Sequence, residues 1–359
     1  MRKKLLLLLP LCLLLAAAWA FASGNSGESL ATLSYLNGIF TGTVDAAVDA
    51  RLDAALPQDG GAMGAPAPAA SSAWTEIRLK QGDLLLGGAG DSVLLLAGSG
   101  QINCSFGAVV DATTGTEVPS GSALSPRHRY IVAEDSTAGF TVTGKTAVLD
   151  YQGSCTLNYS NATDYNAMAS ALKALHLFQG SPTGYGQGFD LEATPTRLQA
   201  LIMFIRVLGE EQEALAWSGS TPFQDVQRGS LGEKYIGYAY EKGYTNGYTG
   251  TQFRPAAAVS ARQYTEFLLR ALGYSTAGGG KISEALTRAQ AAGVLTPGET
   301  AALQAGPFLR ADLVYISYYA LEARLAGGSR TLAEDLMNKG VFTRQERERA
   351  AEMVTGWRL

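Results

Sequence analysis

Beyond about residue 164, apolar positions recur at the spacing of an α-helix, and one helical pattern occurs three times. The three occurrences cover residues 196–209, 260–273 and 309–321. Self-similarity of this kind is typical of a repeat architecture whose units bury one shared core. We therefore predict an all-α, pseudo-threefold region with related sites at the three helix starts.

The pattern differs upstream, where short apolar runs from Trp74 to about Leu157 are separated by Gly, Ser, Asp and Thr. Regular turn signals between β-branched runs predict a small all-β domain, a sandwich or a barrel, over residues 74–158. Residues 23–56 carry apolar positions at nearly helical spacing, which predicts an amphipathic helix. A coiled coil with another chain is the alternative, but fewer than four clean heptads favour packing on its own protein. The predicted fold class is α+β, multidomain.

Two segments near the N-terminus have the patterns of a cleaved signal peptide and of a linker between domains. Residues 1–22 join three basic residues, an apolar stretch and a small-residue exit, the pattern of a secretory signal peptide. A retained anchor is the alternative, but the apolar stretch is shorter than the roughly 20 residues that span a bilayer. Residues 57–73 are rich in Gly, Ala, Pro and Ser and predict a flexible linker. We expect a secreted chain with no membrane span after signal removal.

Charge and cysteine content narrow the class of protein. The chain has 28 Lys and Arg against 32 Asp and Glu, a net charge of −4. Loss of Arg2, Lys3 and Lys4 with the signal leaves 25 against 32, or −7, which argues against a nucleic-acid partner. Cys104 and Cys155 lie in one domain of an exported chain, so a disulfide is expected, with two buried thiols as the alternative.

Residues 222–274 contain the most complete copy of the repeat. It opens with Phe223 and Asp225, continues through a helix that stops at Gly243, and reaches Gly247 before the helix that follows Ser260. This order resembles the S-layer homology family. The family's pattern is Phe-x-Asp-Val, a helix ending Gly-Ile, then Gly-Tyr, Phe-x-Pro, and Ile-Thr-Arg-Ala-Glu opening a helix that ends near Arg-Ala-Leu-Gly.

The resemblance covers about residues 164–325 and implies the usual triplet. The predicted domain over residues 159–359 holds copies at about 164–216, 222–274 and 281–325, followed by C-terminal helices at 329–355. In these last helices, Thr343 and Glu346 have the spacing of a capping box. A truncated fourth copy is the alternative interpretation.

The two histidines are expected to be structural or solvated. His176 lies where the second copy has Gly243, just past a helix end, and no nearby side chains complete a metal set. His128 lies in a loop of the β region without a partner histidine or a nearby carboxylate cluster. We expect no catalytic residue, no metal and no cofactor.

The helix starts carry the candidate binding chemistry. Thr196 is followed three positions later by Gln199, so that side chain and backbone can cap each other. The first helical turn favours an anion, and an arginine there adds a fork that fits a carboxylate or a phosphate. The end of the repeated pattern begins at Arg206 in the first helix and at Tyr319 in the third. Arg197 and Arg310 lie nine residues before these two landmarks and are therefore the best anion-binding candidates.

The second copy departs from this rule, since the same count leads to Ala261 and places Arg262 one position later. A shift of one residue turns a helical side chain by about 100°, so we expect this copy to be structurally intact but weak in binding. The alternative for all these arginines is a solvated helix start or an internal salt bridge, for example with Asp225. Leu309 also lacks the hydroxyl of a capping residue.

The resemblance names the ligand. S-layer homology triplets bind secondary cell-wall polymers on peptidoglycan, often bearing pyruvate ketals on amino sugars. The resemblance therefore implies polymer binding by the helix-start residues, Asp312 among them, and by aromatic side chains such as Tyr248. Self-association or contact with other envelope proteins stays open.

Three functions compete for the whole chain. The first is a non-enzymatic protein held at the cell wall of a Gram-positive envelope, as in an S-layer, that displays the β domain. The second is a wall-bound, glycan-active enzyme, since glycoside hydrolysis needs only two suitably spaced carboxylates. The third is a β domain that acts as a binding or assembly module. We favour the first, because the β region offers one histidine and no nucleophile motif.

Overall fold

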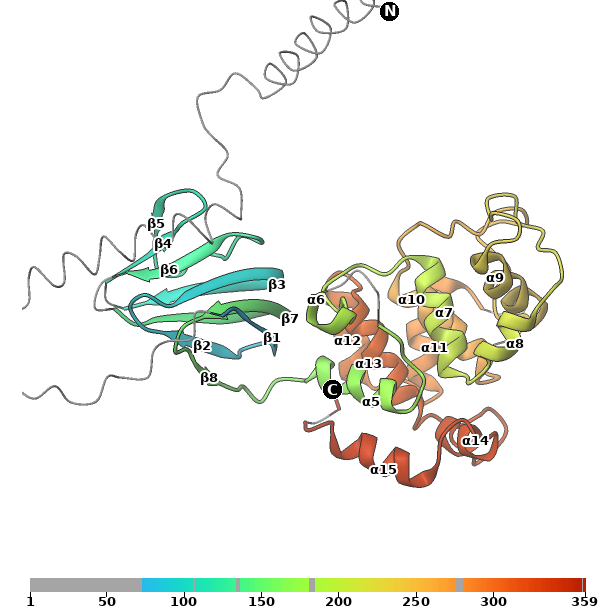
Figure 1. The fold of residues 1–359 in the computed structure, drawn as a ribbon. Coiled ribbons are helices and arrows are strands. Elements are labelled where there is room, and N and C mark those ends of the chain that lie inside the picture. The colour runs from blue at the N-terminus through green and yellow to red at the C-terminus, as the bar shows by residue number, and fades with distance from the viewer. Residues whose placement is uncertain (1–72, 106, 134–135, 181–184, 276–279, 357) are drawn as a thin grey trace, which may run out of the picture. The chain divides into compact units, whose positions relative to one another are not determined.

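The computed structural model describes residues 73–105, 107–133, 136–180, 185–275, 280–356 and 358–359 (Figure 1). The predicted signal peptide, the amphipathic helix and nearly all of the linker lie outside these residues. A helical region follows a β domain along the chain, which confirms the α+β class. Among the described residues, no helix combines the length and apolarity that crossing a bilayer requires.

The β domain consists of antiparallel strands. Their bounds are β1 Thr75–Lys80, β2 Leu84–Gly87, β3 Ser92–Cys104, β4 Ala108–Asp111, β5 Thr116–Val118, β6 Arg129–Ala133, β7 Ala138–Gln152 and β8 Thr156–Asn158. Hydrogen bonds join them into one sheet of order β5-β4-β6-β3-β7-β2-β8, with β1 also on β7. The predicted all-β domain is therefore confirmed, as one eight-stranded antiparallel sheet around residues 75–158.

Strands β3 and β7 are the two long strands of this sheet and pair along most of their length. Two register shifts interrupt β3, between Leu95 and Ala97 and between Gly98 and Gly100, and such irregularities bend a strand. Buried side chains recur along both strands, at alternate positions over parts of β3 and in two continuous runs of β7, with Ile102 and Phe140 among those fully inside. The short apolar runs of the sequence thus supply the core of the β domain.

The expected disulfide is not formed, since Cys104 and Cys155 are not bonded to each other. Cys104 pairs with Ala138 on β7, and Ala138 pairs with Gly87 on β2, beside the start of β8 where Cys155 lies. Three strand spacings of about 4.8 Å each separate the two positions. A disulfide spans roughly 7 Å between Cα atoms at most. The sheet register therefore keeps the two thiols apart.

The helical region contains eleven α-helices and a short 3₁₀ turn within the described residues. Their bounds are α5 Tyr165–Ala174, α6 Tyr185–Gly188, α7 Arg197–Val207, α8 Glu211–Ala216, α9 Leu231–Glu241, α10 Ala261–Ala271, η2 Ile282–Glu284, α11 Ala285–Ala291, α12 Pro297–Ala305, α13 Arg310–Ala320, α14 Leu332–Asn338 and α15 Arg344–Glu352.

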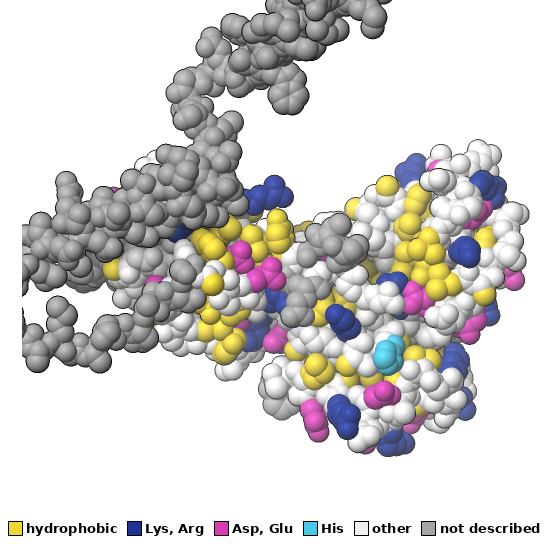
Figure 2. All heavy atoms as spheres, viewed as in Figure 1, with side chains coloured by type: hydrophobic (Ala, Val, Ile, Leu, Met, Phe, Trp, Pro, Cys, Tyr) yellow, Lys and Arg dark blue, Asp and Glu magenta, His cyan; other side chains and the backbone are white. Residues whose placement is uncertain are grey.

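One continuous core joins these helices, as expected for units that cannot bury their apolar faces alone. It includes buried side chains from α5 to α15, such as Leu172, Phe204, Tyr235, Leu268, Val314 and Ala350. Figure 2 shows basic and acidic side chains interspersed over the visible face of this region. Local charge at individual sites is therefore more informative than a single charged face.

Candidate functional site

The helices α7, α10 and α13 begin where the sequence places the repeated motif, and each has eleven residues. Arg197, Ala261 and Arg310 are their first residues. This confirms the register count, which put Ala261 rather than Arg262 at the arginine position. The three starts are thus equivalent in backbone and different in side chain.

The predicted caps are present at the first two starts. The hydroxyl of Thr196 accepts the Gln199 N–H at 3.2 Å, while the Gln199 side chain accepts the Thr196 N–H at 3.0 Å. Ser260 and Gln263 form the same reciprocal pair. At α13, the side chain of Leu309 has no oxygen that could accept a backbone N–H. The Asp312 carboxylate nevertheless accepts the Leu309 N–H at 2.9 Å. Asp312 is buried and so supports the helix start rather than facing a ligand.

Arg197 and Arg310 make the same kind of contact, Arg197 with a loop later in the chain and Arg310 with a loop earlier in the chain. The Nε of Arg197 donates to the carbonyl of Phe253 at 2.8 Å, and the Nε of Arg310 donates to that of Phe189 at 3.2 Å. The backbone N–H of Arg197 also donates to the carbonyl of Ala257, and that of Arg310 donates to the carbonyl of Ala193. Each arginine therefore ties its helix start to the loop of another segment.

Arg197 is committed to internal contacts. Its residue is only 4% exposed, and its guanidinium lies 4.9 Å from the centre of the Phe253 ring. Burial lowers the pKa of Arg197, and the charge of Asp225 opposes that shift. The structure thus places one of the two best candidates from the sequence in a structural position rather than in an open anion site.

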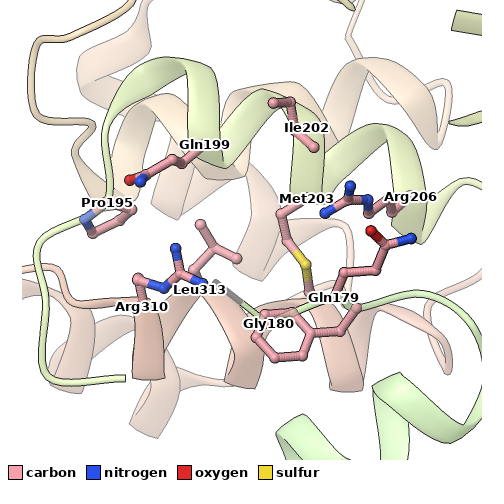
Figure 3. A pocket seen from close by; sticks show the side chains of 10 residues that line it. Gln179, Gly180, Pro195, Gln199, Ile202, Met203, Arg206, Arg310 and Leu313 are labelled. Atoms are coloured by element: carbon pink, nitrogen blue, oxygen red, sulfur yellow. The ribbon is translucent and has the colours of Figure 1, made fainter. Parts of the chain in front are cut away.

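Arg310 instead lines a pocket of about 200 Å³, called here the Arg310 pocket (Figure 3). Its lining comes from three segments and comprises Phe178, Gln179, Gly180, Pro195, Gln199, Ile202, Met203, Arg206, Arg310 and Leu313. Figure 3 shows Arg206 and Gln179 close together at one end, and Arg310 near Pro195 at the other. Two guanidinium groups and two carboxamides therefore share one pocket with apolar walls.

The charges around Arg310 partly offset one another. Burial lowers the pKa of Arg310, the carboxylates of Asp190 and Glu192 oppose that shift, and the charge of Arg206 adds to it. The Nε of Arg206 donates to Glu211 at 2.7 Å, and its side chain is 18% exposed. The pocket retains donors on both arginines, which suits a ligand with an acidic group.

Arg206 is the site residue that the sequence interpretation missed, since it served there only as a landmark at the end of the helix. Nine residues at about 100° each turn Arg206 half a revolution away from Arg197. Gln199, Met203 and Arg206 have the spacing of one helical face, and all three line the pocket. This face could have been found from the spacing alone.

The remaining predicted polymer-binding residues lie elsewhere. Tyr248 is 53% exposed, and the guanidinium of Arg254 stacks over its ring at 3.6 Å from the centre. Arg262 is exposed and lines a second pocket, together with Ala261. The structure therefore does not bring all the predicted residues into one site.

The residues predicted to be structural support the loop that carries Arg254. Phe223 is buried against Phe253, and Asp225 accepts the N–H groups of Phe253 at 2.9 Å and Arg254 at 2.7 Å. These bonds hold Arg254 at a φ of 60°, a left-handed conformation that is strained for arginine. The Asp225 carboxylate thus compensates a backbone strain.

The glycines of the repeat have left-handed backbones. Gly243 and Gly247 have φ values of 73° and 79°, and a Cβ on Gly247 would lie 2.3 Å from a ring carbon of Phe223. His176 adopts the same conformation, with a φ of 62°, at the place predicted for it past α5. The structural interpretation of His176 is therefore supported by its backbone.

His128 differs from its prediction, since its Nδ1 lies 2.7 Å from a carboxylate oxygen of Asp111. Burial alone would raise the pKa of Asp111, but the hydrogen bonds from His128 and Thr113 hold that pKa below its usual value. The partner was missed because 17 residues separate the two positions. The described residues contain no group of three or more His, Cys, Asp or Glu placed to hold a metal ion.

The acids of the β domain bear on the enzymatic alternative. Glu76 and Asp150 are direct partners across β1 and β7, so they share one face of the sheet. Burial raises the pKa of Asp150, and the charge of Glu76 adds to that shift. One pocket on the described part of the β domain, of about 580 Å³, is lined by Leu84, Leu86, Asn103, Ser105, Thr137, Gly139 and Thr141, with no acid among them.

Comparison with known protein families gives a match for one segment of the chain. Residues 222–260 match the S-layer homology domain, a segment that runs from the Phe223 motif to the cap of α10. No curated protein matches the chain. An S-layer homology domain binds cell-wall polymers and implies association with the cell wall or cell surface.

Proposed function

We propose that this chain is a non-enzymatic surface protein whose helical region binds an anionic secondary cell-wall polymer and so retains the β domain at the wall. The match at residues 222–260 supports attachment to the wall. In this proposal, the N-terminal signal peptide directs export and is removed. The β domain is then displayed outward.

The observation that carries the proposal is the convergence of Arg206 and Arg310 in one pocket. A pyruvate ketal presents a carboxylate and a methyl group on one carbon. The two guanidinium groups suit the carboxylate, and the side chains of Met203 and Leu313 suit the methyl group. We infer that this pocket takes the acidic substituent of the polymer.

We further propose that the helical region is a triplet of S-layer homology copies. Equal lengths of α7, α10 and α13 and the shared contacts of Arg197 and Arg310 support this proposal. The third helix start departs from the family pattern by its missing hydroxyl cap. The Arg310 pocket nevertheless lies at that start, which makes it the working site in this scheme.

Sedimentation with purified wall sacculi tests the proposed function. The wild-type chain is expected to co-sediment with intact sacculi and to remain in solution with sacculi stripped of their polymer. Arg310→Gln removes a charged donor, so affinity is expected to fall about 10- to 100-fold, the equivalent of about 1.5–3 kcal/mol. Arg206→Gln is expected to have an effect in the same direction.

Arg349→Gln is the matched control, because Arg349 is an exposed arginine in the last turn of α15 and lines none of the pockets described above. It should leave co-sedimentation unchanged. Equal binding to stripped and intact sacculi would exclude the polymer as the ligand. Equal losses in Arg310→Gln and Arg349→Gln would show that total charge, rather than the pocket, governs binding.

A further inference from the structure

A second pocket, called here the Ala261 pocket, lies at the start of α10 and has a volume of about 350 Å³. Its lining includes the buried side chains of Ala261 and Phe308 and the partly buried Leu303. Exposed Thr194, Gln304 and Arg262 also contribute to it. Pockets of this size and mixture are typical of small-molecule sites.

Its interior is apolar where the other two helix starts have an arginine. Ala261 is 6% exposed and occupies the first helical position, which Arg197 and Arg310 occupy in α7 and α13. The N–H of Gln263 is already satisfied by the Ser260 hydroxyl. The inner part of this pocket therefore offers apolar contact, while Thr194 and Gln304 offer hydrogen bonds at exposed positions.

One short backbone segment lies between this pocket and the Arg310 pocket. Thr194 lines the Ala261 pocket, and the next residue, Pro195, lines the Arg310 pocket. The N–H of Arg310 donates to the Ala193 carbonyl at 2.9 Å, and the N–H of Val259 donates to the Pro195 carbonyl at 3.1 Å. Residues 194 and 195 thus join the linings of the two pockets, so the pockets are neighbours along this segment.

We propose that the Ala261 pocket is a subsite for an uncharged, acetamido-bearing sugar residue, adjacent to the acidic residue held in the Arg310 pocket. This inference rests on the proposed function and specifies which part of the polymer the second pocket takes. The acetamido methyl group contacts Ala261, Leu303 and Phe308. Its amide group finds hydrogen-bonding partners in Thr194 and Gln304.

Three synthetic probes test the proposal with the full chain. The first is the methyl glycoside of N-acetylglucosamine with a 4,6-pyruvate ketal. The second extends it by one N-acetylglucosamine, and the third extends it by glucose, which lacks the acetamido group. Calorimetry should show that the wild-type chain prefers the second probe over the third by about tenfold.

Gly306→Leu blocks the pocket without disturbing the core. Gly306 lines the Ala261 pocket, and a Cβ on it would meet no atom within 4 Å. This variant should lose the preference for the acetamido probe and keep its affinity for the monosaccharide. Gly250→Leu is the matched control, since a Cβ at Gly250 also meets no atom within 4 Å and this residue lines neither pocket. Ala261→Leu fills the pocket from the start of α10 and should repeat the effect of Gly306→Leu.

Distinct results overturn the two proposals. Equal wild-type affinity for both disaccharides, or a preference that survives Gly306→Leu, overturns the acetamido subsite and leaves the Arg310 pocket standing. A large loss of monosaccharide binding in Arg262→Gln would instead identify a second anionic site. Monosaccharide binding that is absent in the wild type, or unaffected by Arg310→Gln, overturns the proposed function itself.

Discussion

The helices α7 and α13 both begin with an arginine that donates to a backbone carbonyl, but the surroundings of the two arginines differ. Arg197 and Arg310 each donate an Nε hydrogen to the carbonyl of a loop phenylalanine. Arg197 is enclosed by that contact and by the Phe253 ring, whereas Arg310 remains at the edge of a pocket. One motif position can therefore be enclosed by the scaffold in one place and line a pocket in another.

Neighbouring charge separates the two starts further. The loop residue with a left-handed backbone is Arg254 beside Arg197 and Asp190 beside Arg310, with φ values of 60° and 49°. This loop residue contributes a like charge near Arg197, where Asp225 supplies the opposite charge, and an opposite charge near Arg310, where Arg206 supplies the like charge. The predictions below test whether this division into a structural and a binding start is real.

The largest expected effect is on stability. Arg197→Ala removes packing against Phe253 and leaves the Phe253 carbonyl without its donor, so the free energy of unfolding should fall by about 3 kcal/mol. Arg310→Ala, at a more open position, should lower it by about 1 kcal/mol. Urea unfolding followed by far-UV circular dichroism measures both. Equal losses would remove the distinction between the two starts.

Asp225→Ala tests the support beneath Arg254. Two backbone N–H groups lose their acceptor, so the free energy of unfolding should fall by about 2 kcal/mol. Adding Arg254→Gly should restore about 0.5–1 kcal/mol, because glycine adopts the left-handed backbone at little cost. The same urea titrations compare the single and double variants. No recovery in the double variant would argue against strain at Arg254.

Local pattern was enough to predict much of the fold. Short apolar runs between turn signals predicted the β domain, and helical spacing predicted α7, α10 and α13 at their observed starts, the first two with cap residues. The register count also placed Ala261 correctly. These features depend on residues within one or two turns of each other, so a single sequence contains the information.

The pairing of distant segments could not be predicted in the same way. Arg197 is buried by Phe253, which lies 56 residues away, and Arg310 is tied to Phe189 at a separation of 121 residues. The sequence around each arginine does not indicate which of the two becomes enclosed when the chain packs. The prediction of a disulfide between Cys104 and Cys155 was wrong because it also depends on distant segments. The order of strands β3, β7, β2 and β8 sets the separation of the two cysteines.

A smaller effect is expected at the caps. Thr196→Ala removes the hydroxyl that accepts the Gln199 N–H, and Ser260→Ala removes its counterpart at α10, so each should lower the free energy of unfolding by about 1 kcal/mol. Leu309→Ser should leave α13 no less capped, since Asp312 already accepts the Leu309 N–H. Thermal unfolding would compare the three variants. Unchanged stability in both Ala variants would show that the caps contribute little here.

The smallest expected effect concerns the charge next to Arg310. Asp190→Asn removes an opposing carboxylate and keeps a residue type that tolerates the left-handed backbone. A partly exposed charge pair is worth less than about 1 kcal/mol, so polymer affinity should rise about twofold at low salt and less at high salt. Co-sedimentation with sacculi at two salt concentrations measures the change. Arg254→Asn, the corresponding change beside the enclosed Arg197, should leave affinity the same, and a loss there would mean that the α7 start also takes part in binding.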